Sequence, residues 1–77
     1  MENWFEHIET NPEILYGKPV IKNTRIAVDL ILEKLAQGDT VNELLEAYPT
    51  LRVEDISACL LFASETIKNE VFIPKAS

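Results

Sequence analysis

The sequence is poor in the residues that cross-link a small protein or anchor it in a membrane. It holds one cysteine, Cys59, which cannot form an internal disulfide and so fits a reducing cytosol. No apolar stretch approaches the roughly 18 residues that span a bilayer. Residues 1–4 lack the basic start and the apolar run of a signal peptide. These absences predict a cytoplasmic protein that does not engage a membrane.

Histidine is equally scarce, and no arrangement of residues indicates an enzyme. His7 is the single histidine, and the carboxylates beside it lack metal-ligand spacing. We interpret His7 as a surface histidine beside a short strand. Cys59 lies on an apolar helical stripe without a base at a matching spacing, so we expect it to act as a small hydrophobic residue. The sequence predicts no catalytic residue, no metal site and no cofactor.

The acidic balance of the chain says most about its partners. The formal net charge is −6, from 13 acidic and 7 basic residues. Three of the bases, Lys18, Lys22 and Arg25, lie in a segment without any acid between Glu13 and Asp29. An acidic protein is a poor general binder of nucleic acid, because phosphate contacts supply most non-specific affinity. It suits a basic protein partner. The charges therefore favour a protein partner over nucleic acid, except at the small basic segment that holds Lys18, Lys22 and Arg25.

The length of 77 residues allows one domain with a thin core. A chain this short buries only about 60% of its unfolded surface, so a homodimer or a standing partner is a natural source of further burial. The hydrophobic content of 47% argues against disorder. We expect a single domain over 1–77, with an extended or β arm at 1–26, a helical core at 27–70 and an apolar tail at 71–77.

Helical signals dominate the chain after the arm. Apolar residues at the i, i+3, i+4, i+7 spacing of an amphipathic helix occupy 28–35, and Gly38 ends this first helix. Thr40 begins a second helix, and Glu43 completes a capping box with it. The second helix ends at Pro49. A third helix is expected from about residue 53 to about residue 70. Its apolar face is predicted to hold Ile56, Cys59, Leu60, Ala63 and Ile67.

The bend Tyr48-Pro49-Thr50-Leu51 joins the second and third helices as in a helix-turn-helix. The pattern therefore predicts a mainly α, trihelical helix-turn-helix bundle. Such domains often place their last helix in the DNA major groove, although short bundles use the same layout without touching DNA.

The arm is punctuated by prolines, so brief strands are expected there rather than a long helix. Val20-Ile21 and Arg25-Ile26 are predicted to form a small hairpin around Lys22-Asn23-Thr24. Asn23 is the residue of this gap most able to adopt a left-handed conformation.

Several runs of residues carry a resemblance to a known family. Residues 11–26 read Asn-Pro-Glu-Ile-Leu-Tyr-Gly-Lys-Pro-Val-Ile-Lys-Asn-Thr-Arg-Ile, and Tyr48-Pro49-x-Leu51 and Glu54-Asp55-Ile56 follow downstream. Together they closely resemble the bacterial and archaeal family called domain of unknown function 433 (DUF433), over nearly the whole chain. The resemblance implies a homeodomain-like trihelical fold with a short N-terminal β segment. It also implies an antitoxin role beside a toxin resembling the PIN-type ribonucleases.

The chain departs from the pattern of that family at three places. Asn23 replaces a glycine, Ala27 replaces a proline, and Arg52-Val53 replaces a Thr-Pro pair. Asn23 can keep a positive φ at modest cost. Arg52 cannot cap a helix as threonine does, which is expected to weaken the start of the third helix by about 1 kcal/mol. The starting residue of that helix is left open.

We therefore expect an antitoxin of a bacterial type II toxin–antitoxin pair, which neutralises a PIN-like ribonuclease and binds operator DNA weakly as a homodimer. Acidic residues begin the third helix, where they would repel the phosphates of DNA. The bases before the first helix should therefore make the main DNA contact, and the bend is expected to serve the fold. Thr24 and Arg25 could instead tie the turn to the helical core. The expected phosphate contacts are Lys18, Lys22, Thr24, Arg25 and Arg52.

The expected toxin contact is the apolar tail, at Val71, Phe72 and Ile73. A second hypothesis needs no DNA at all. In it the chain is a dimeric protein-interaction adaptor, whose acidic surface and apolar tail engage one partner.

Overall fold

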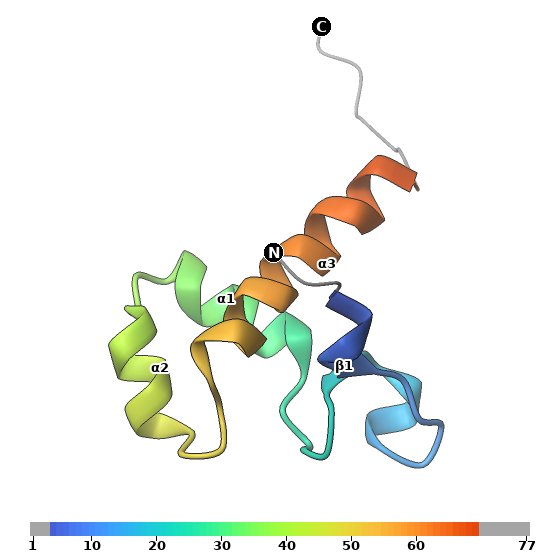
Figure 1. Ribbon diagram of the computed structural model, residues 1–77, viewed down its shortest axis with the longest axis horizontal. Coiled ribbons are helices and arrows are strands. Elements are labelled where there is room, and N and C mark those ends of the chain that lie inside the picture. The colour runs from blue at the N-terminus through green and yellow to red at the C-terminus, as the bar shows by residue number, and fades with distance from the viewer. Residues whose placement is uncertain (1–3, 70–77) are drawn as a thin grey trace, which may run out of the picture.

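Three helices pack against a short β segment in the computed structural model, which describes residues 4–69 (Figure 1). The helices are α1 (Val28–Ala36), α2 (Val41–Ala47) and α3 (Val53–Asn69). Two strands, β1 (Ile8–Glu9) and β2 (Val20–Ile21), and two short helical turns, η1 (Trp4–Glu6) and η2 (Leu15–Gly17), precede them. The predicted mainly α, trihelical bundle with a short N-terminal β segment is confirmed.

The two strands form an antiparallel pair in which Ile8 lies opposite Ile21 and Glu9 opposite Val20. The predicted hairpin around Asn23 is present as a short antiparallel pairing, in which Val20 forms a bridge with Ala27 and the Ile21 N–H donates to the Ile26 carbonyl at 3.0 Å. The bridge partner Ala27 lies one residue beyond the predicted Arg25-Ile26. The segment after the turn enters α1 almost at once, and the longer pairing of β2 is with β1, which the sequence did not predict.

The turn itself has the predicted backbone conformation. Asn23 adopts a φ of 63°, and its N–H donates to a carboxylate oxygen of Glu9 at 3.3 Å. Asparagine tolerates the left-handed region better than most residues, so the turn survives without the glycine typical of the family.

The end of α1 is fixed by Gly38, as the sequence predicts. Gly38 has a φ of 102°, and its N–H donates to the Leu35 carbonyl at 3.0 Å. The Asp39 N–H donates to the Lys34 carbonyl at 3.0 Å. These two bonds form a complete Schellman motif, which satisfies carbonyls that would otherwise lack partners.

The predicted capping box starts α2. The Thr40 hydroxyl accepts from the Glu43 N–H at 3.1 Å, and the Glu43 carboxylate accepts from the Thr40 N–H at 2.8 Å. Pro49 follows α2 in the bend, where the Leu51 N–H donates to the Tyr48 carbonyl at 2.9 Å and the Leu51 side chain is buried.

The start of α3, which the sequence leaves open, is Val53. A carboxylate oxygen of Asp55 accepts the Arg52 N–H at 3.0 Å. This bond satisfies a backbone donor at the helix start from within the helix, which is one half of a capping box. The missing threonine cap is therefore partly replaced by Asp55.

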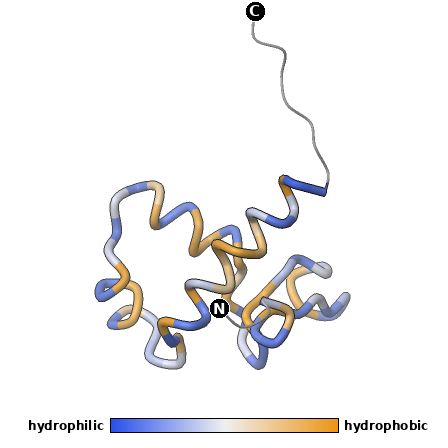
Figure 2. The backbone as a smooth tube through the Cα atoms, turned by 45° about the horizontal axis from the view of Figure 1, so that its top comes forward, coloured by the Kyte–Doolittle hydropathy of each residue, from blue (hydrophilic) through white to orange (hydrophobic). Residues whose placement is uncertain are grey.

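The core lies where α1, α2, the bend and the first half of α3 meet the β segment. Apolar and polar stretches alternate along the backbone of the helices, as Figure 2 shows, and the buried apolar residues of α3 all lie in its first half. Burying each large aliphatic side chain is worth about 1.5 to 3 kcal/mol. The core residues are Ile8, Val20, Ile21, Ala27, Val28, Ile31, Leu44, Leu51, Ile56, Ala58 and Cys59.

One expectation about burial is wrong. His7 is buried rather than at the surface, because its ring bonds the buried carboxylate of Asp55. On the predicted apolar face of α3, Ile56 and Cys59 are buried, whereas Leu60 and Ile67 are 52% and 67% exposed. The C-terminal half of α3, which carries Ile67, projects past the ends of the other elements (Figure 1). No helix within residues 4–69 has the length and apolar character needed to cross a membrane.

Candidate functional site

The turn between β2 and α1 and the bend between α2 and α3 meet on one face of the molecule. Two pockets there share Asn23 and Thr24 from the turn and Thr50 from the bend. One pocket, of about 360 Å³, is also lined by Lys22 and Arg52. The other, of about 600 Å³, is also lined by Arg25. We call the surface formed by Lys22, Arg25 and Arg52 around these pockets the basic face.

The bend and the basic segment contribute to the same surface. Thr50 of the bend lines the same pockets as the bases that precede α1. Arg52, which directly follows the bend, lines one of these pockets together with Lys22. The bend contributes to the candidate site as well as to the architecture.

The floor of the smaller pocket is a buried pair of polar side chains. Nδ1 of His7 lies 3.1 Å from Oδ1 of Asp55, and the two residues are only 8% and 4% exposed. Oδ2 of Asp55 accepts the Arg52 N–H and lies 3.8 Å from Nε of Arg52. Asp55 thus holds both the backbone and the side chain of Arg52 at the edge of the pocket.

The predicted phosphate contacts do not all come together. Lys18 lies elsewhere, with its Nζ 3.0 Å from Oδ2 of Asp29 at the N-terminal end of α1. Lys22 and Arg25 are exposed and take part in no ion pair within residues 4–69. The free cationic groups of the candidate site are therefore Lys22 and Arg25, with Arg52 partly engaged by Asp55.

The Thr24 hydroxyl ties the turn together. It donates to the Ile21 carbonyl at 2.6 Å and accepts from the Ile26 N–H at 3.0 Å. Its single proton is thus already directed to the backbone, so Thr24 is not among the phosphate donors that we retain. This is the alternative interpretation of Thr24 that the sequence left open.

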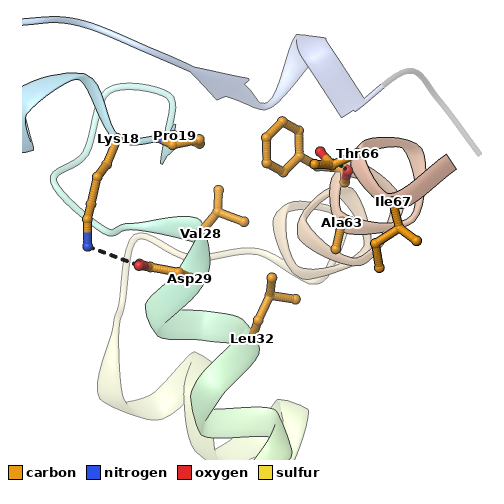
Figure 3. Close-up of a pocket in the computed structure, with 9 residues that line it drawn as sticks. Lys18, Pro19, Val28, Asp29, Leu32, Ala63, Thr66 and Ile67 are labelled. Atoms are coloured by element: carbon orange, nitrogen blue, oxygen red, sulfur yellow. Dashed lines mark hydrogen bonds and ion pairs between the residues drawn. The ribbon is translucent and has the colours of Figure 1, made fainter. Parts of the chain in front are cut away.

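The predicted toxin contact, Val71, Phe72 and Ile73, lies outside the residues that the structure describes. An apolar groove of about 270 Å³ is found within them, between α1 and the projecting half of α3. Figure 3 shows Val28 and Leu32 of α1 beside Ala63 and Ile67 of α3, with the ion pair of Lys18 and Asp29 at one end.

Groups suited to catalysis are not assembled in this part of the chain. Within residues 4–69, no three His, Cys, Asp or Glu side chains are grouped so as to hold a metal ion. Cys59 is buried, and desolvation, with a smaller effect from the charge of Asp55, raises the pKa of its thiol to about 12. The thiol is therefore protonated at neutral pH and is a poor nucleophile.

The sequence reasoning missed His7 and Asp55 as members of the site. Both lie in stretches that it interpreted otherwise, His7 as a surface residue and Asp55 as one of the acidic residues that begin the third helix. Their separation of 48 residues gives no spacing signal that would pair them. Their pairing depends on how the β segment packs against the start of α3.

Comparisons with known proteins agree on one family. The model of the family described as "Protein of unknown function (DUF433)" matches residues 8–63. An uncharacterised protein, y4eO, of Sinorhizobium fredii is 36% identical over 58 residues, which are 75% of this chain and 26% of that protein. A crystal structure of a DUF433 member from Anabaena variabilis superposes with a TM-score of 0.76 at 33% identity, over 82% of this chain and 62% of that one. This chain spans about a quarter of the Sinorhizobium relative and under two thirds of the Anabaena chain. The match of family, sequence and fold shows that the chain belongs to the DUF433 family.

Proposed function

We propose that this chain is the antitoxin of a bacterial type II toxin–antitoxin pair, which neutralises a PIN-like ribonuclease and contacts operator DNA as a homodimer. The observation that carries the DNA contact is the convergence of Lys22, Arg25 and Arg52 on one face, from two separate segments. Three cations around two pockets fit the backbone phosphates of a duplex, which fix the register and orientation of a bound protein. The proposal assigns the chain no catalytic step.

The toxin contact rests on the remaining charge and on the family resemblance. Outside the basic segment the chain is strongly acidic, which suits a basic surface on the partner. An acidic antitoxin can cover the cationic, RNA-binding side of a ribonuclease by the same attraction that draws RNA to it. Co-expression with a PIN-like ribonuclease encoded by a neighbouring gene tests this half directly. Relief of growth arrest is expected, and continued arrest contradicts the antitoxin role.

The DNA contact is tested by gel shifts with the promoter of the gene itself, at low and at moderate salt. A dimer with six phosphate contacts loses about a thousandfold in affinity between about 50 and 200 mM salt. The variant Lys22→Ala/Arg25→Ala/Arg52→Ala should remove most of this binding and flatten its dependence on salt. Lys34→Ala, on α1 away from both pockets, is the control and should bind as the wild type does.

A second candidate is a dimeric protein-interaction adaptor without DNA binding. The observation that favours it is the presence of Glu6 and Glu9 in the linings of the two pockets, which reduces the attraction for phosphate. The gel shift separates the two candidates. If no shift occurs at low salt while the nuclease still binds, the adaptor is the better description.

A further inference from the structure

We propose that the groove between α1 and α3, together with the projecting half of α3, is the surface through which two copies of this chain associate. The inference rests on the homodimer of the proposed function and assigns its interface. The groove holds about 270 Å³ and is lined mainly by apolar side chains, among them Val28, Leu32, Phe62 and Ala63 (Figure 3).

An apolar stripe that runs from the middle of α3 into its projecting half borders this groove. Leu60, Ala63 and Ile67 follow the spacing of one helical face, and Leu60 and Ile67 are 52% and 67% exposed. A helix whose apolar residues extend beyond its own bundle usually has a partner on that side. Phe62 is already covered on another side by Trp4, whose ring centroid lies 5.0 Å away in an edge-to-face contact. The open side of this part of α3 is therefore the groove and the stripe.

The surface offers a second copy both apolar side chains to bury and a groove to receive them. Leu60 and Ile67 are large and more than half exposed, and the small Ala63 lies between them along the helix and lines the groove. A two-fold axis near the middle of this stretch would place the large residues of each copy in the groove of the other. Contacts of this isologous kind are the commonest way in which small proteins form dimers.

Charge also selects this surface for a second copy. Two chains of net charge −6 repel each other over most of their surfaces. Between Leu60 and Ile67 the one charged residue is Glu65. At the far end of the groove, Lys18 and Asp29 neutralise each other in their ion pair. Two copies therefore meet with little repulsion along this stretch of α3.

The test is sedimentation equilibrium of the full chain over a wide concentration range. Ile67→Asp places a charge on the stripe, and Leu60→Gln shortens the apolar contact without changing the net charge. Val53→Asp is the matched control, because Val53 is 53% exposed on the same helix but lies in its first turn, outside the groove. The wild type should dimerise, and both stripe variants should raise the dimer dissociation constant at least about tenfold. Val53→Asp should leave it within about twofold of the wild type.

Two outcomes would overturn the interface. Stripe variants that dimerise as tightly as the wild type, or a Val53→Asp variant weakened as much as Ile67→Asp, would place the dimer contact elsewhere while the homodimer itself stands. A wild type that is monomeric at the highest concentration would remove both the interface and the homodimer. The antitoxin activity would then still be decided by the co-expression test. Circular dichroism of every variant confirms that a change in association does not come from unfolding.

Discussion

Nδ1 of His7 lies 3.1 Å from Oδ1 of Asp55, and this pair joins the N-terminal segment to the first turn of α3. Oδ2 of the same carboxylate accepts the Arg52 N–H at 3.0 Å. Asp55 therefore serves the fold and the basic face together, because it positions the residue that brings the bend into that face.

The first prediction is that His7 and Asp55 are energetically coupled. Asp55→Ala removes the buried carboxylate that bonds the His7 ring and accepts the Arg52 N–H, and should lower the free energy of unfolding by about 3 kcal/mol. A double-mutant cycle of His7→Ala and Asp55→Ala, measured by denaturant unfolding, should give a coupling of about 1 to 3 kcal/mol. The exposed neighbour Glu54→Ala serves as control and should change stability by no more than about 0.5 kcal/mol. Strictly additive effects of the two substitutions would contradict the coupling.

The second prediction concerns the capping box at the start of α2. Thr40→Ala removes the side-chain acceptor of the Glu43 N–H and should lower the free energy of unfolding by about 1 kcal/mol. Asn42→Ala, an exposed position one residue inside the same helix, lacks this role and is the control. Thermal unfolding of the two variants beside the wild type makes the comparison. Equal loss of stability in both would mean that the cap contributes nothing specific.

The third prediction is that the same cap makes stability depend on pH in the acid range. The hydrogen bond from the Thr40 backbone, and then that from its side chain, lower the pKa of Glu43 below 4.5 in the folded state. A lowered pKa means that the stabilisation is present above 4.5 and is lost as the pH falls through the folded-state pKa. Thr40→Ala removes the side-chain bond but keeps the backbone N–H, so an NMR titration of the Glu43 carboxyl should show its pKa moving only part of the way back toward 4.5. An unchanged titration would show that the Thr40 side chain does not contribute to the lowered pKa.

The features that the sequence predicts well are those fixed by residues close together in the chain. Gly38 ends α1 because a left-handed residue must follow a helix that closes with a Schellman motif. Thr40 and Glu43 start α2 because both partners of the capping box lie within one helical turn. Asn23 occupies the left-handed position of its turn for a similarly local reason. Each of these depends on neighbours within about five residues, which a sequence displays directly.

The features that the sequence does not predict depend on packing between distant segments. His7 and Asp55 are 48 residues apart, and only the tertiary structure brings them together. The apolar periodicity of α3 puts Leu60 and Ile67 on one face with Ile56 and Cys59, but it cannot say which of these residues the rest of the fold covers. The chain turns between Lys18 and the other bases, so Lys18 forms an ion pair with Asp29 and lies apart from those bases. The sequence thus predicts which cations are available for the candidate site, but it does not predict where each of them lies in the structure.

The fourth prediction is that Cys59 makes the protein less stable in alkali. Burial, and then the charge of Asp55, raise the pKa of its thiol from 9.0 to about 12 in the folded state. Because the folded state holds this proton more tightly than the unfolded chain, stability is kept below pH 9.0 and falls as the pH rises toward about 12. Denaturant unfolding of the wild type and of Cys59→Ala at a series of pH values isolates this effect from that of other groups. The difference between the two proteins should be constant below pH 9.0 and should shift against the wild type above it. A difference that stays constant throughout would show that the thiol titrates alike in the folded and unfolded states.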